Sequence, residues 1–105
     1  MSSEKRLYPR KSWNGKVVFE DELGEGLVYL HARDISLGGL FLEENPPLQM
    51  GSYLLLSFVL PGKKRSLRVT GQVMRFIGEK NGGIGIRFVD LPEPVFRQLA
   101  QFLSE

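Results

Sequence analysis

The sequence has 105 residues, of which 42% are hydrophobic and 25% are charged, with a formal net charge of +2 and a pI near 9.1. A chain of this length hides roughly 65% of its unfolded surface on folding, so we expect one domain around one core. It contains no cysteine and one histidine, which excludes disulfides, thiolate metal ligands and histidine clusters. The charge is too mild to make a nucleic-acid polymer the expected partner, but a small anionic ligand remains open.

The sequence carries no signal for a membrane and none for an enzyme. We find no apolar run of about 18 residues or more, and no charged start followed by a hydrophobic block, so we expect a cytoplasmic domain without a membrane span. A general base needs an orienting partner and a nucleophile, and we identify neither for His31. We therefore expect a binding function.

The first segment of the chain is polar and basic. Residues 1–12 include Lys5, Arg6, Arg10 and Lys11, with a proline inside the cluster. Proline disfavours a helix here, so we predict a flexible, extended arm. Arg6 and Arg10 would then project to one side, roughly 13 Å apart at the backbone, a gap that two long side chains can largely close on one ligand. The alternative is a solvated terminus whose charges aid solubility.

Short apolar runs between turn signals fill the middle of the chain. We expect strands at 16–20, 27–33, 40–42, 53–60, 67–77 and 84–88, where β-rich or alternating patterns occur. An acidic, glycine-containing turn at 21–26 predicts a hairpin between the first two. The alternation that starts at Leu67 slips near Met74–Ile77, which indicates a bulge or an increase in burial.

The last segment has the pattern of one short helix. Apolar residues recur at helical spacing in 92–104, at Val95, Phe96, Leu99, Phe102 and Leu103. We expect this stripe to cover a barrel end rather than to bind a partner helix. The fold class is therefore mainly all-β: a small closed antiparallel six-stranded β-barrel over 16–90, with a C-terminal α-helix and a flexible N-terminal arm, because closure removes exposed strand edges.

A polar, glycine-rich corner joins the second and third predicted strands, with the sequence Asp34-Ile35-Ser36-Leu37-Gly38-Gly39. On an extended backbone Asp34 and Ser36 point to the same side. A carboxylate and a hydroxyl together suit a group with N–H donors, such as the N1/N2 edge of guanine. Gly38 and Gly39 permit positive φ or a close approach of a ligand to the backbone. The alternative is a structural turn stabilised by the Asp or Ser side chain.

Two short motifs therefore occur in a fixed order on a β-rich chain. Arg6-Leu7-Tyr8-Pro9-Arg10 has the form RxxxR, and residues 34–39 match (D/N)xSxxG, with one strand pair between them. Neither motif is specific alone. Together, in this order and on a chain of this size, they resemble a PilZ domain, a bacterial receptor for cyclic di-GMP, and the resemblance covers essentially the whole chain.

The resemblance implies a role for each residue that matches a motif. Arg6 and Arg10 would hold the phosphates and guanine Hoogsteen edges of the dinucleotide, since the planar guanidinium fork pairs with both. Asp34 and Ser36 would read a guanine edge, and Gly39 would leave room for the base.

Other residues are additional candidates for ligand contact: Lys5, Tyr8, Arg33, Gly38 and Arg87. Tyr8 could stack on a base or pack on the barrel, whereas Trp13 is expected to pack on the barrel. Some PilZ domains have Arg immediately before RxxxR and bind a stacked pair of ligands, while others have an apolar residue there and bind one. Here the residue is Lys5, so the resemblance leaves the stoichiometry open.

By the same resemblance, the ligand is cyclic di-GMP, no cofactor is needed, and the domain is a receptor or adaptor that signals in trans. Its partner would be a protein of the motility, exopolysaccharide or transcription machinery. Ligand would order the arm on the barrel and so change the surface that the partner meets. We expect no nucleic-acid polymer, because Asp34 would repel phosphate at the site. The alternative is a PilZ-fold interaction module that does not bind nucleotide.

Overall fold

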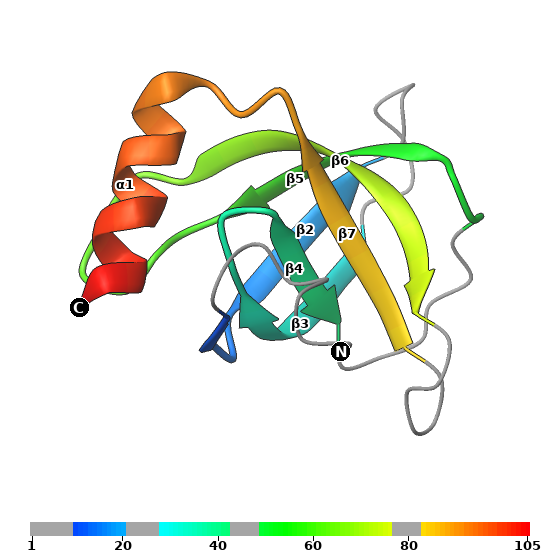
Figure 1. Cartoon of the computed structure of the whole chain (residues 1–105), viewed down its shortest axis with the longest axis horizontal. Helices are drawn as coiled ribbons and strands as arrows, with labels where there is room; N and C mark the ends of the chain where they lie inside the picture. The colour runs from blue at the N-terminus through cyan, green and yellow to red at the C-terminus, as the bar shows by residue number, and fades with distance from the viewer. Residues whose placement is uncertain (1–9, 21–27, 43–48, 77–82) are drawn as a thin grey trace, which may run out of the picture.

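The computed structural model describes residues 10–20, 28–42, 49–76 and 83–105. This part of the chain contains seven strands and one helix (Figure 1). They are β1 (Lys11–Ser12), β2 (Lys16–Glu20), β3 (Val28–Ile35), β4 (Gly39–Leu42), β5 (Tyr53–Phe58), β6 (Leu67–Phe76), β7 (Gly83–Val89) and α1 (Glu93–Ser104).

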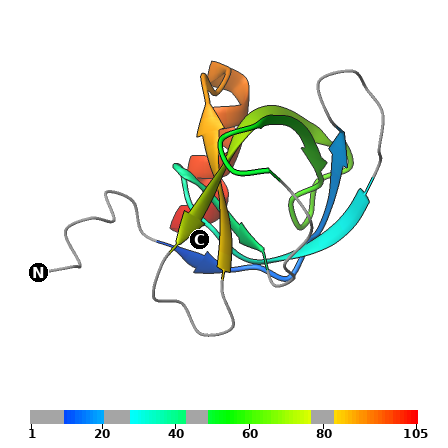
Figure 2. The ribbon, with the colours of Figure 1, turned by 90° about the vertical axis from the view of Figure 1, so that its right-hand side faces the viewer.

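The strands form one antiparallel sheet that closes on itself. Their order is β1-β3-β2-β5-β6-β7-β4, and a further pairing of β3 with β4 joins the two sides. Strands β2 to β7 are thus the predicted closed six-stranded barrel, and β1 is one extra strand beside β3. Figure 2 shows the strands curling around the interior of the barrel. Closure matters for the site because it brings β3, β4 and β7 side by side.

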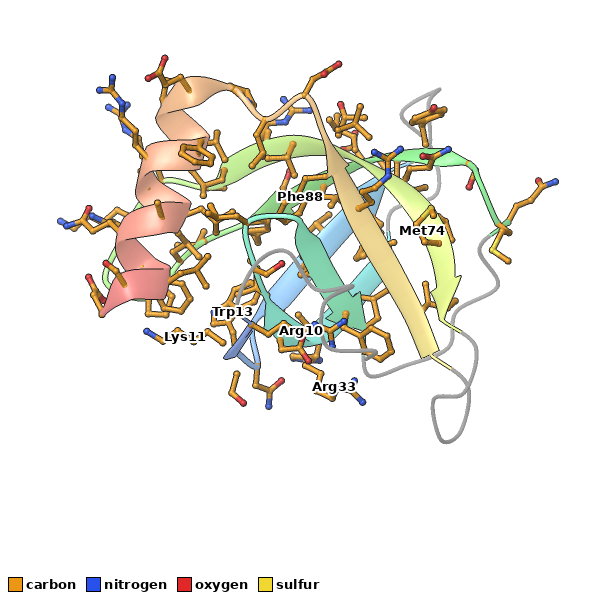
Figure 3. All side chains as sticks on the ribbon, viewed as in Figure 1. Arg10, Lys11, Trp13, Arg33, Met74 and Phe88 are labelled. Carbon is orange, nitrogen blue, oxygen red and sulfur yellow. The ribbon has the colours of Figure 1, made fainter. Side chains whose placement is uncertain are left out.

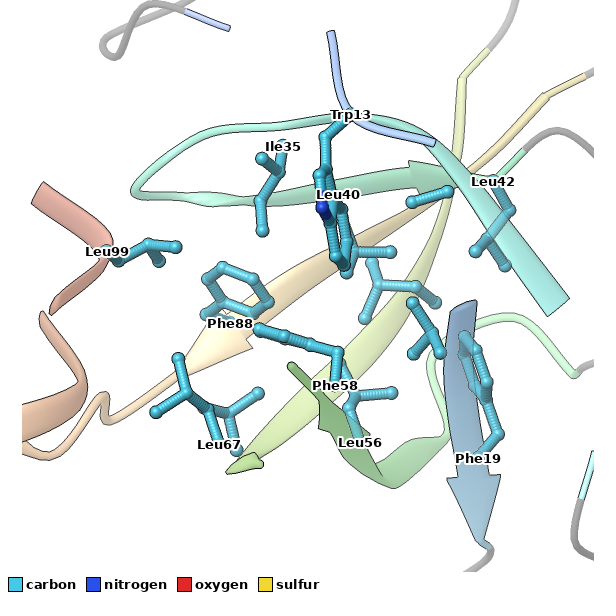
Figure 4. Packing of buried hydrophobic residues seen from close by; sticks show 14 of the residues in the cluster. Trp13, Phe19, Ile35, Leu40, Leu42, Leu56, Phe58, Leu67, Phe88 and Leu99 are labelled. Carbon is cyan, nitrogen blue, oxygen red and sulfur yellow. The ribbon is translucent and has the colours of Figure 1, made fainter. Parts of the chain in front are cut away.

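Alternating side chains fill the barrel interior, as the period of a β-strand requires. In β5, Leu54, Leu56 and Phe58 are buried while the residues between them are not. Trp13 packs as predicted: it is 8% exposed, and its ring centroid lies 5.5 Å from that of Phe58. Figure 4 shows Trp13 pointing into this cluster. The segment that follows the predicted arm is therefore anchored in the core.

Helix α1 covers one end of the barrel, as the apolar stripe predicted (Figure 1). Val95, Leu99 and Phe102 belong to the same core cluster as the strand residues. The stripe is narrower than the sequence indicated, because Phe96 is 44% exposed. No helix in the described ranges is long and apolar enough to cross a membrane.

Two details of the strands differ from the sequence prediction. The slip predicted near Met74–Ile77 had two possible causes, a bulge or an increase in burial. The bulge is wrong for Met74 to Phe76, because β6 pairs with β7 in an unbroken register there. Burial does not increase at Met74, which is 37% exposed, and Ile77 lies outside the described residues. A bulge occurs instead in β3, between Ala32 and Asp34.

In addition, Lys11 and Ser12, which the sequence placed in the arm, pair with Ile35 and Asp34. The acidic turn at 21–26 lies outside the described residues.

Candidate functional site

The N-terminal segment reaches the predicted corner because it runs along β3. In β1, Ser12 is the register partner of Asp34. The Trp13 amide continues the contact by donating a hydrogen bond to the Arg33 carbonyl, with an N–O distance of 3.1 Å. This pairing fixes the chain immediately before β1, so that Arg10 lies beside Asp34 (Figure 3).

Two arginines share the Asp34 carboxylate. Arg10 Nε lies 3.7 Å from Asp34 Oδ1, and Arg33 Nε lies 3.4 Å from Asp34 Oδ2. The side chains of Arg10 and Asp34 are only 22% and 15% exposed, so this pair is better shielded from solvent than an ordinary surface salt bridge. Arg10 comes from one sequence motif and Asp34 from the other, and the fold brings them together.

Phe41 forms the second part of this site, which sequence reasoning missed. It is the register partner of Asp34 across β3 and β4, and its neighbours Leu40 and Leu42 belong to the core cluster. Strand alternation therefore directs the Phe41 ring to the face of β4 opposite this cluster, beside Asp34, and the ring is buried there. The guanidinium carbons of Arg33 and Arg10 lie 4.1 Å and 5.5 Å from the ring centroid, within cation–π range. The alternation of Gly39–Leu42 was the signal that could have identified it.

The corner itself is a tight turn held by Ser36. The Ser36 amide donates to the Gly39 carbonyl at 2.8 Å, and the Gly38 amide donates to Ser36 Oγ at 3.1 Å. The Ser36 hydroxyl also lies 3.4 Å from the Gly39 carbonyl oxygen. These bonds are those of the Ser-stabilised structural turn. A ligand contact of Ser36 remains a prediction that such a turn does not exclude, because a hydroxyl oxygen has two lone pairs.

The neighbouring strand β7 leaves no room for a side chain at Gly39. A Cβ atom there would lie 2.0 Å from the Ile86 carbonyl oxygen of β7, far inside van der Waals contact. The positive φ that the sequence allowed for Gly38 and Gly39 is not used, since among the described glycines it occurs at Gly51 and Gly62. The close approach at Gly39 is thus that of the β7 backbone. A contact of Gly39 with a ligand stays a prediction.

The remaining candidates fall into two groups. Arg87 is the register partner of Gly39 in β7, but its guanidinium Nη2 donates to Gln72 Oε1 of β6 at 2.5 Å, on the side of β7 away from β4. Lys5, Arg6 and Tyr8 lie outside the described residues. Arg10, Arg33 and Asp34 therefore form the described centre of the site, with Ser36, Gly38 and Gly39 in the adjoining turn.

The side chains of this centre are chemically suited to recognising a ligand. Two guanidinium groups can bind anionic oxygens in a bidentate manner, and a carboxylate beside them can accept N–H donors. Within the described ranges, no group of three His, Asp or Glu side chains is placed to hold a metal ion.

Comparisons with known proteins agree with this fold. Over 93% of its length the chain superposes on 48% of the Bacillus subtilis inhibitor of motility (MotI/DgrA), with a TM-score of 0.74 and 20% identity. For YcgR of Escherichia coli in complex with c-di-GMP, the coverage is 95% of this chain and 45% of that one, with a TM-score of 0.74 and 21% identity. The chain thus spans about half the length of these two proteins.

A shorter structure matches more completely. The PilZ domain of Escherichia coli YcgR with c-di-GMP is covered over 88% of its length by 94% of this chain, with a TM-score of 0.69 and 22% identity. A search of curated proteins gives no match. At these identities the structural likeness shows the fold, while the sequence itself matches the family model described as "PilZ domain" over residues 4–105. The chain therefore belongs to the PilZ domain family.

Proposed function

We propose that this PilZ domain is a receptor for cyclic di-GMP that signals in trans to a protein partner. The observation that carries the proposal is the contact between Arg10 and Asp34, because it joins the RxxxR and (D/N)xSxxG motifs in one site. Both of the Escherichia coli YcgR structures contain c-di-GMP, which supports the same ligand. As members of this family, such domains bind ligands and act as receptors or adaptors rather than enzymes.

In this proposal each part of the site has one task. Arg6 and Arg10 bind the phosphates and the Hoogsteen edges of the guanines, while Asp34 and Ser36 accept hydrogen bonds from a guanine Watson–Crick edge. Gly39 keeps β4 close to β7 and leaves room for the base. The ligand supplies the charge that ties residues 1–9 to the barrel.

Isothermal titration calorimetry with cyclic di-GMP tests the proposal directly. We expect saturable binding at micromolar ligand, and the molar ratio distinguishes one ligand from a stacked pair, which Lys5 leaves open. Absence of saturable heat would contradict the receptor function. If the domain bound no cyclic di-GMP but still captured a partner protein, it would be a PilZ-fold interaction module that does not bind nucleotide.

Signalling in trans requires that the ligand change the surface a partner meets. We propose that ordering of the N-terminal arm provides this change in a cytoplasmic domain, with a motility, exopolysaccharide or transcription protein as the partner. One similar structure is that of an inhibitor of motility, which supports the motility class. Partner capture that depends on cyclic di-GMP is the expected result, and capture that ignores the ligand would contradict it.

A further inference from the structure

The bulge in β3 decides where the Arg33 side chain lies. Ala32 and Ile35 are both fully buried, although three positions apart they would face opposite sides of a regular strand. The extra residue between Ala32 and Asp34 in the β3–β4 register resolves this conflict. As a result, the side chains of Arg33 and Asp34 both face away from the core, whereas consecutive residues in a regular strand would not.

Arg33 is then held in place from two directions. The Asp34 carboxylate lies 3.4 Å from its Nε, and the Phe41 ring lies 4.1 Å below its guanidinium carbon. Arg10 approaches the same carboxylate and the same ring. Two like charges so close together repel each other in the absence of a compensating group. Asp34 and the negative face of the Phe41 ring together supply that compensation.

We propose that Arg33 is a third arginine of the ligand site, that Phe41 positions it, and that both described arginines transfer from Asp34 to the ligand phosphates on binding. This inference rests on the proposed function. In Figure 3, Arg10 and Arg33 lie together on the outer side of β3, so one anionic group can reach both. Arg87 is not included, because its guanidinium is bonded to Gln72 of β6, on the side of β7 away from β4, and its contact with a ligand stays a prediction.

The transfer is an exchange of partners that gives the carboxylate and both guanidinium groups new partners in the ligand. In the free protein the Asp34 oxygens face the Nε groups of Arg10 and Arg33. In the complex, the N1–H and N2–H donors of a guanine replace them on the carboxylate, and the two guanidinium groups move to phosphate oxygens. A ligand that lacks the guanine donors would give new partners only to the guanidinium groups, and a ligand that lacks phosphates would give a new partner only to the Asp34 carboxylate. The site therefore selects a guanine nucleotide that carries both groups.

Calorimetry with cyclic di-GMP on matched variants tests this assignment. We expect Arg33→Ala to weaken binding about tenfold or more, which is the change for the loss of a contact of about 1.4 kcal/mol. The affinity of Arg33→Lys should lie between those of wild type and Arg33→Ala, because an ammonium group keeps the charge but lacks the planar fork of a guanidinium. Phe41→Leu should also weaken binding, and its effect should be smaller in the Arg33→Ala background than in wild type, since the part of its role that acts through Arg33 is then already lost. Arg68→Ala is the charge control: it removes an exposed arginine on β6, three strands from β3 in either direction around the barrel.

The salt dependence of binding separates ligand contact from a structural role. Arg33→Ala should reduce the loss of affinity between low and high salt, because one cation–phosphate pair is missing, whereas Arg68→Ala should keep the wild-type dependence. If wild type binds and Arg33→Ala binds equally well, the third arginine is refuted while the receptor function stands. If Arg33→Ala weakens binding but Phe41→Leu does not, the positioning role of Phe41 is refuted. If wild type itself does not bind, the proposed function and this inference fall together.

Discussion

At the scale of single residues, Asp34 is the point where the two sequence motifs meet. Its carboxylate contacts Arg10 from the N-terminal segment and Arg33 from its own strand, and its backbone partners are Ser12 in β1 and Phe41 in β4. Its side chain is 15% exposed and so remains within reach of a ligand. A substitution here should therefore change both the proposed recognition of the base and the restraint on the arginines.

We expect Asp34→Ala to weaken cyclic di-GMP binding by tenfold or more. Each charge-assisted hydrogen bond from guanine is worth about 1.5 kcal/mol or more, and a loss of about 1.4 kcal/mol already lowers affinity tenfold. Asp34→Asn should fall between alanine and wild type, because the amide keeps one acceptor oxygen but turns an NH₂ group toward the second donor. Calorimetry measures both variants. Wild-type affinity of Asp34→Ala would refute the assignment of this residue to the guanine edge.

At the scale of elements, the two residues of β1 and the residue before it link two distant parts of the molecule. Arg10 points to Asp34 and Phe41, whereas Lys11 Nζ donates to the carbonyl oxygens of Phe102 and Glu105, at 2.9 Å and 3.2 Å. Lys11 Nζ also lies 4.3 Å from the Phe102 ring centroid. Figure 3 shows Lys11 directed to the end of α1 and Arg10 directed away from it. Helix α1 has no basic residue of its own in the last turn, so Lys11 supplies the charge that favours a helix C-terminus.

Lys11→Ala should therefore loosen the last turn of α1. The charge-assisted bond and the helix-end interaction together contribute about 1 kcal/mol, which corresponds to a fall of roughly 5 °C in the melting temperature of a domain of this size. Thermal unfolding and amide hydrogen exchange in Gln101–Glu105 measure the effect. Lys63→Ala, in the exposed loop between β5 and β6, is the matched control. Equal melting temperatures for the two variants would show that Lys11 does not stabilise the helix end.

The same elements show what a sequence pattern can and cannot predict. Alternation within β5 and helical spacing in α1 are local, so the barrel and the closing helix were predicted correctly. The bulge at Arg33 was not, because it follows from the pairing of β3 with β4, and pairing depends on residues distant in sequence. The same holds for β1, which the sequence assigned to the arm, and for Phe41, which reads as a core residue until its register partner is known. Arg10 and Asp34 were recognised by their motifs, and only the fold gave their contact.

At the scale of the whole molecule, the arginines proposed to bind the ligand divide between the barrel and the segment before it. In the part of the chain that the structure describes, every residue of the core cluster lies from Trp13 to Phe102, and the strand pairings that close the barrel are all formed after residue 15. Arg10 and Arg33 are placed by this framework, whereas Arg6 precedes it. Folding and binding should therefore respond differently to a truncation at the N-terminus.

We expect a variant without residues 2–9 to keep the fold and to lose cyclic di-GMP binding. The deletion leaves every core residue that the structure describes in place, so the circular dichroism spectrum should be retained and the melting temperature should change by no more than a few degrees. It removes Arg6, which we propose contacts phosphate, and the loss of a contact of about 1.4 kcal/mol already lowers affinity tenfold. Removal of residues 2–4 is the matched control, because it shortens the chain but keeps Arg6, and it should bind as wild type. If the variant without residues 2–9 binds cyclic di-GMP, Arg10, Arg33 and Asp34 suffice as a site and the role of Arg6 is refuted. If this variant unfolds, residues 2–9 are needed for the stability of the barrel, and the expected separation of folding from binding is wrong.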